Sequence, residues 1–82
     1  MIIFDGHEYE STADLPDIGS FRCDTLENGK RNYLGLSTDI AKLPKVATYP
    51  EYTDLKTGST AYCVDTGELY MYEASNDNWY EQ

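Results

Sequence analysis

The feature that most constrains the fold of this chain is an internal repeat with a period of about forty residues. Short matches occur in the same order in both halves of the sequence, at offsets of 40, 39 and 40. They are Asp14-Leu15, Gly19-Ser20 and Cys23 in the first copy, and Asp54-Leu55, Gly58-Ser59 and Cys63 in the second. Because order and offset agree, we interpret the 82 residues as one domain made of two diverged units. Residues 1–44 form the first unit with an N-terminal hairpin, residues 45–57 a connector, and residues 58–82 a C-terminal β-meander.

Turn residues predict an antiparallel hairpin in the first unit. Asn28-Gly29 is typical of a two-residue type I′ turn, because both central positions of that turn need positive φ. A turn closed there pairs Glu27 with Lys30 and places Cys23 opposite Leu34.

A second hairpin is predicted around Asp65-Thr66-Gly67, which fits a three-residue loop ending in a left-handed glycine. This loop pairs Cys63 with Leu69 and Ala61 with Met71. Both registers therefore place the repeated cysteine opposite a leucine on an apolar face.

Tyrosines mark the opposite face of the second hairpin. Since side chains alternate along a strand, Tyr62, Tyr70 and Tyr72 are expected to point the same way. After the turn residues 75–78, a third strand would place Trp79 on the core face beside Met71 and Tyr80 on the tyrosine face. The candidate residues for binding a protein partner are Tyr62, Tyr70, Tyr72 and Tyr80. The alternative is that the helical turns cover these tyrosines, which then form a second core.

Three further elements complete the predicted fold. Phe4-Asp5-Gly6-His7 reads as a tight turn between strands at 2–4 and 7–10. Helical turns are expected from Ser11 or Thr12 to Leu15-Pro16, and from Ser37 or Thr38 to Leu43-Pro44. Seven short strands and two helical turns give an α+β, mostly β domain, a small antiparallel β-meander.

The charge of the chain disfavours two classes of partner. Fifteen acidic residues against six basic ones give a net charge of −9, which repels nucleic-acid phosphates and anionic membranes. The acids are either a solvated surface or a mimic of nucleic-acid charge. No signal peptide or membrane-spanning run is recognisable, so we expect synthesis in the cytoplasm and free, reduced cysteines.

No constellation of catalytic or metal-binding residues is recognisable. His7 is the single histidine and is expected to be a partly exposed strand residue. Cys23 and Cys63 lack the paired short spacings of zinc sites, and a Cys63 thiol facing the core would be inert toward His7. The isolated glycines form no phosphate-binding loop. We therefore expect no enzyme activity, no cofactor and no metal.

The C-terminal part of the chain contains the segment Gly58-Ser59-Thr60-Ala61-Tyr62-Cys63-Val64-Asp65-Thr66-Gly67-Glu68-Leu69-Tyr70-Met71-Tyr72, followed by Trp79-Tyr80. This segment resembles a β-meander of tailed-phage head-fibre and related virion proteins. Residues 29–37 and 39–44 are similar to small phage proteins that carry the same meander. The resemblance implies a virion-associated, multi-copy structural role without catalytic residues. A fibre is disfavoured because the chain has no fibrous extension, which favours a head-decoration, neck or tail component made in the host bacterial cytoplasm.

The resemblance implies that the partners are other virion proteins. It leaves open whether the chain also forms a homo-oligomer. Two other functions remain as alternatives. One is an acidic phage inhibitor of a host nucleic-acid-binding protein, which the net charge would suit. The other is a small carbohydrate-binding module, because tyrosines stack on sugars.

Overall fold

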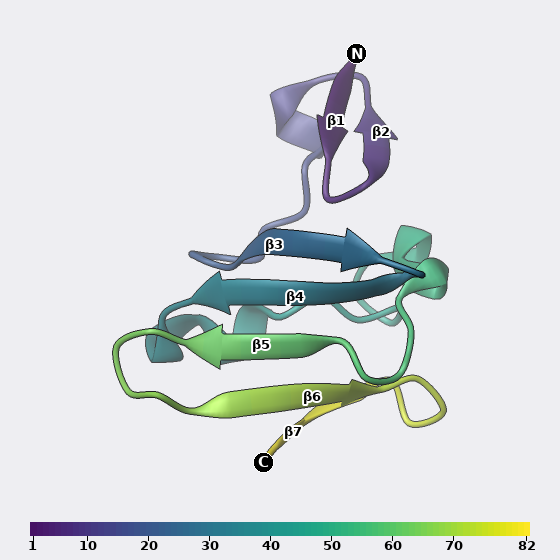
Figure 1. Ribbon diagram of the computed structural model, residues 1–82. Helices are drawn as coiled ribbons and strands as arrows, with labels where there is room; N and C mark the ends of the chain where they lie inside the picture. The colour runs from purple at the N-terminus through teal and green to yellow at the C-terminus, as the bar shows by residue number, and fades with distance from the viewer.

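The computed structural model describes residues 1–82 and contains two β-sheets and three short 3₁₀ helices (Figure 1). A two-stranded antiparallel sheet pairs β1 (Ile2–Phe4) with β2 (His7–Tyr9). The second sheet has the order β3-β4-β5-β6-β7. Its strands are β3 (Arg22–Glu27), β4 (Lys30–Gly35), β5 (Thr60–Cys63), β6 (Leu69–Glu73) and β7 (Asn78–Glu81). The predicted mostly β class and the seven strands are confirmed.

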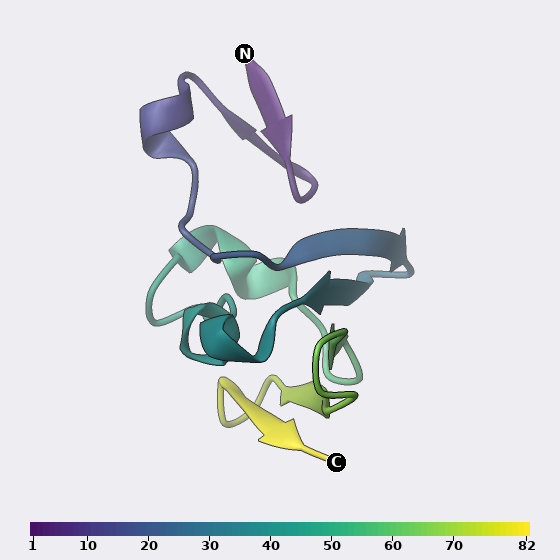
Figure 2. The same cartoon turned by 90° about the vertical axis from the view of Figure 1, so that its left-hand side faces the viewer.

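The five-stranded sheet joins a hairpin to a meander. β3–β4 and β5–β6–β7 are antiparallel, whereas β4 and β5 run parallel. Parallel neighbours need a crossover, and residues 36–59 provide it. Figure 2 shows that the helices of this crossover lie on one side of the sheet, so they cover one face and leave the other open.

The 3₁₀ helices agree with prediction at two of three places. η1 (Thr12–Asp14) and η2 (Ser37–Lys42) lie where helical turns are predicted. η3 (Pro50–Asp54) lies in the connector, where no helix is predicted, and it brings the completely buried Tyr52 into the core. None of these helices has the length and apolar character needed to cross a membrane.

The core lies between the covered face of the sheet and the crossover. It contains Ile18, Phe21, Tyr33, Leu43, Tyr52, Leu55, Ala61, Cys63, Tyr72 and Trp79. Four of these ten side chains are large aromatics with a polar atom, and such groups need partners when buried. The indole Nε1 of Trp79, for example, donates to the carbonyl oxygen of Pro44 at 2.9 Å.

The two proposed repeat units begin alike. Asp14 and Asp54 each end a 3₁₀ helix, and each is followed by a leucine with extended φ and ψ. Gly19 and Gly58 then both adopt positive φ, at 62° and 97°. Each unit continues into an antiparallel hairpin, but Cys23 is the second residue of the edge strand β3, whereas Cys63 is the last residue of the central strand β5.

The register of the first hairpin agrees with prediction only near its turn. Glu27 pairs with Lys30 as predicted. Cys23, however, lies opposite Tyr33 rather than Leu34, because a register shift between Cys23 and Thr25 adds a bulged residue to β3.

The predicted register of the second hairpin is wrong by one residue. Ala61 lies opposite Tyr70 rather than Met71, and Tyr62 lies opposite Leu69. The Cys63 amide donates to the Glu68 carbonyl at 2.8 Å, so the loop includes residues 64–67 and is one residue longer than predicted. A one-residue shift exchanges the two faces of the paired strand.

The third strand is only partly as predicted. Trp79 is in the core, but it lies opposite Tyr72 rather than beside Met71. Tyr80 lies opposite Met71.

Candidate functional site

The four candidate tyrosines do not share a face, so the predicted tyrosine face is wrong. Tyr72 is 1% exposed and Tyr70 is half-buried, both on the covered side of the sheet with Ala61. Tyr62 and Tyr80 are 42% and 43% exposed, on the open side. The crossover covers Tyr70 and Tyr72 as the alternative predicts, but they do not form a second core: Tyr72 belongs to the single core of the domain and Tyr70 packs against it.

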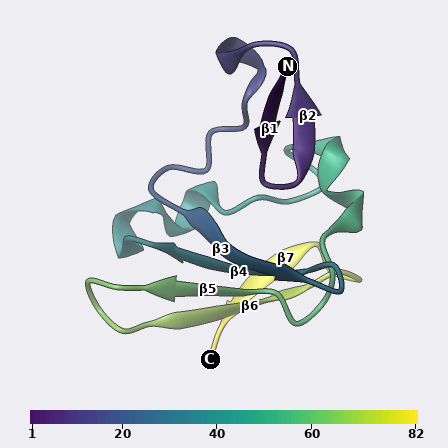
Figure 3. The ribbon, with the colours of Figure 1, turned by 45° about the horizontal axis from the view of Figure 1, so that its top comes forward.

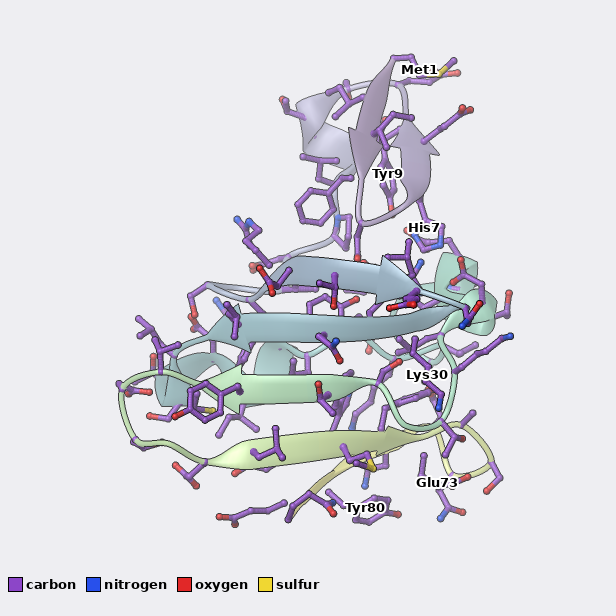
Figure 4. All side chains as sticks on the ribbon, in the orientation of Figure 1. Met1, His7, Tyr9, Lys30, Glu73 and Tyr80 are labelled. Atoms are coloured by element: carbon purple, nitrogen blue, oxygen red, sulfur yellow. The ribbon has the colours of Figure 1, made fainter.

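The open face instead carries a patch of mixed apolar side chains. Cross-strand partners share a face, so the pairs Leu34–Tyr62 and Tyr62–Leu69 form one apolar row across three strands. Met71 and Tyr80 form a neighbouring pair. Together with Val64, which is 57% exposed, these side chains make the open-face patch: Leu34, Tyr62, Val64, Leu69, Met71 and Tyr80. Figure 4 shows Tyr80 at the β7 edge of the sheet.

Polar side chains border the patch on the β3 side. Asn32 donates to the Thr25 hydroxyl at 2.6 Å and accepts from the Thr60 hydroxyl at 2.8 Å. These hydrogen bonds cross three strands and fix the polar border. Beside this polar border lies an open polar depression of about 240 Å³, lined by Glu27, Asn28, Lys30, Asn32 and Gly58.

The second notable cluster lies between the N-terminal hairpin and the large sheet. The hairpin stands over the β3 edge (Figure 3), and its turn residue Asp5 has positive φ, at 55°. The Asp5 carboxylate accepts hydrogen bonds from the hydroxyls of Tyr33 and Tyr52, the latter at 2.6 Å. Arg31 Nε donates to Asp5 Oδ1 at 3.1 Å and Arg31 Nη2 donates to the Asp5 carbonyl at 3.0 Å. Asp5 thus connects the hairpin to the body of the domain.

Electrostatics in this buried cluster favour neutral phenols and a charged guanidinium. Burial and the Asp5 carboxylate raise the pKa of Tyr33 and of Tyr52 far above the ordinary value. Burial lowers the pKa of Arg31, but the hydrogen bond to Asp54 and the charge of Asp5 outweigh it and the pKa is raised. The cluster thus holds two neutral phenols and a charged guanidinium around the Asp5 carboxylate.

The sequence analysis missed this cluster. Asp5 was assigned only to a turn, and no short-range pattern links it to Arg31 or Tyr52. One signal was present: Arg31 alternates in phase with Tyr33, which places its side chain on the covered face of β4.

His7 and Cys63 lie close to expectation. His7 is half-buried, with its Nε2 3.0 Å from Asp54 Oδ2 and its ring edge-on to Tyr52. Cys63 and Cys23 are free thiols, and burial raises the pKa of both, which keeps them protonated and poorly nucleophilic. No group of three or more histidine, cysteine or carboxylate side chains is arranged to hold a metal ion.

Comparison with known proteins gives one result. No protein-family model, curated protein or solved structure matches this chain. The open-face patch and the buried cluster are therefore the features from which a function can be inferred.

Proposed function

We propose that this chain is an accessory structural protein of a tailed-phage particle, a head-decoration, neck or tail component that acts by protein–protein contact. The observation that carries the proposal is the open-face patch. Large apolar side chains gather there on a sheet face that no other part of the chain covers, and such patches on small domains are typical of interaction sites. The resemblance of residues 58–80 to a virion meander supports the phage context.

Contact through the patch is physically reasonable because the sheet is held rigid. The polar border fixes β3, β4 and β5, and the core anchors the opposite face. A pre-organised surface loses little conformational entropy on binding. Tyr62 and Tyr80 add large contact areas with few rotatable bonds.

Particle incorporation tests the proposal. The double variant Leu34→Ser/Tyr62→Ser removes two exposed side chains of the patch without opening the core. We expect it to remain folded by circular dichroism and to be missing from purified particles of the phage that encodes the chain. Ile3→Ser is the matched control, because Ile3 is 65% exposed on the distant N-terminal hairpin. Incorporation of the double variant at the wild-type level would contradict the proposal.

A further inference from the structure

The two edges of the five-stranded sheet differ in what protects them. The N-terminal hairpin stands over the β3 edge (Figures 1 and 3), where the Arg22 guanidinium lies 5.5 Å from the centre of the Phe4 ring. A Cβ atom at Gly6 would lie 3.1 Å from Leu26 Cδ2, so the hairpin turn also approaches β3 closely. The β3 strand is bulged as well. Cover and bulges are the devices that stop an edge strand from pairing with another chain.

The β7 edge has neither device. β7 pairs with β6 through four consecutive residue pairs without a bulge. The Gln82 amide donates to the Leu69 carbonyl at 2.8 Å, so alternation along the strand turns the backbone groups of Trp79 and Glu81 away from β6. No other segment of the chain makes a backbone hydrogen bond to these outward groups. The β7 edge is therefore free to pair with a further strand.

The outward groups are symmetric about Tyr80, which suits a second copy of the same strand. An antiparallel β7 with its Tyr80 opposite this Tyr80 would exchange both backbone hydrogen bonds at each of two Trp79–Glu81 pairs. The side chains also fit this register. The two Tyr80 rings meet as an aromatic cross-strand pair, and each Glu81 lies opposite an indole rather than opposite another carboxylate.

We infer that β7 is a self-association edge, which pairs antiparallel with β7 of a second copy about Tyr80 and joins two five-stranded sheets into one. The contact uses the backbone of β7, so it is independent of what the open-face patch binds. Two net charges of −9 repel each other, and a four-residue edge buries far less than the roughly 800 Å² per partner of a stable complex. The dimer is therefore weak in dilute solution and strengthened by salt.

Cysteine cross-linking tests the register. Residues opposite each other at a pair without hydrogen bonds have Cα atoms about 4.5 Å apart, a separation that a disulfide spans. With oxidised glutathione, Tyr80→Cys should give at least about fivefold more disulfide-linked dimer than Tyr62→Cys. Tyr62 is the matched control, because it is 42% exposed against 43% for Tyr80 but lies on the central strand β5. The wild-type chain measures any linkage through Cys23 or Cys63.

Two substitutions at Glu81 assign the cross-link to strand pairing. Glu81→Pro removes an amide that faces away from β6, so circular dichroism should show a folded chain. In the Tyr80→Cys background it should reduce the cross-link to the level of Tyr62→Cys. Glu81→Gln removes only the charge and should preserve the cross-link. Raising the salt from roughly 50 mM to roughly 300 mM should increase the dimer, because it screens the repulsion between the copies.

Three results would overturn the inference: equal cross-linking of Tyr80→Cys and Tyr62→Cys, cross-linking that Glu81→Pro leaves unchanged in a folded chain, or a dimer that weakens as salt is added. The first and third results do not depend on how well Glu81→Pro folds. All three are measured on the purified chain, so they are separate from the incorporation of the chain into particles.

Discussion

Asp5 and Arg31 form an ion pair that is almost completely withdrawn from solvent. Arg31 Nε lies 3.1 Å from Asp5 Oδ1, and the two side chains are 2% or less exposed. The pair joins the tip of the N-terminal hairpin to β4, and Tyr33 and Tyr52 bind the same carboxylate. The hairpin has no strand pairing with the large sheet, and it is attached by this cluster together with the hydrogen bond from the Tyr9 hydroxyl to Glu51 at 2.7 Å.

Asp5→Asn should destabilise the domain by about 3 kcal/mol, because it leaves the buried Arg31 guanidinium with only the half-exposed Asp54 carboxylate, 3.1 Å from Nη2, as a counter-charge. That is a large share of the roughly 5 kcal/mol expected for a domain of this size. Urea denaturation followed by circular dichroism measures the free energy of unfolding. Glu8→Gln, on the exposed side of the same hairpin, is the control. A loss below about 1 kcal/mol for Asp5→Asn would show that the pair contributes little to stability.

The raised pKa values of Tyr33 and Tyr52 predict loss of stability in alkali. A phenol whose pKa is raised on folding contributes stability fully below its unfolded pKa, which is 10.0, and that contribution is lost as the pH rises above it. The free energy of unfolding should therefore decrease above about pH 10. Tyr33→Phe should make this decrease shallower, and urea titrations from about pH 8 to about pH 11 measure it. An unchanged pH slope in Tyr33→Phe would contradict the assignment.

The same substitution should reduce stability much more at Tyr72 than at Tyr62. Tyr72→Ser empties a core position and removes the hydrogen bond from its hydroxyl to Asp77 Oδ1, at 2.5 Å, so we expect a loss of about 3 kcal/mol or more. Tyr62→Ser changes an exposed side chain and should alter stability by less than about 1 kcal/mol. Thermal denaturation of the two variants in parallel tests this. Equal losses would mean that the two tyrosines lie in similar surroundings, contrary to the register of β5 and β6.

Sequence reasoning succeeded where the information is local. The Asp5-Gly6 and Asn28-Gly29 turns both adopt the positive φ values that their residues favour, and the hairpins close there. The prolines after Leu15 and Leu43 follow the ends of two 3₁₀ helices as predicted. The mostly β class follows from these turns and from the short strands between them.

The prediction failed for the second hairpin, where one additional loop residue decides which side chains share a face of the sheet. Gly67 has the predicted positive φ, at 78°, but the loop contains Val64 as well. That residue shifts β6 against β5 and moves Tyr70 and Tyr72 from the expected binding face to the covered one. Loop residues alone did not distinguish a three-residue from a four-residue connection, and the sheet face depends on that difference.

Patterns in short segments of the sequence do not predict the contacts between residues that are far apart along the chain. The parallel pairing of β4 with β5 spans the whole crossover, and Tyr52 enters the core from a segment with few aliphatic residues. The buried cluster joins residues about 25 to 50 positions apart, which turn and strand patterns do not relate.

Gly35→Ala should destabilise the domain through a steric clash with Phe21. A methyl group at residue 35 would lie 2.5 Å from the Phe21 ring, which is completely buried and has no room to move. We expect a loss of about 1–3 kcal/mol from overpacking. Leu36→Ala, at an exposed neighbouring position, is the control and should change stability by about 0.5 kcal/mol or less.

Phe21→Leu makes room for the methyl group at residue 35. The double variant Gly35→Ala/Phe21→Leu should therefore be more stable, by about 1 kcal/mol, than the sum of the two single losses predicts. Urea denaturation of the four variants and the wild type measures this coupling, and strictly additive losses would show that residue 35 does not pack against the Phe21 ring.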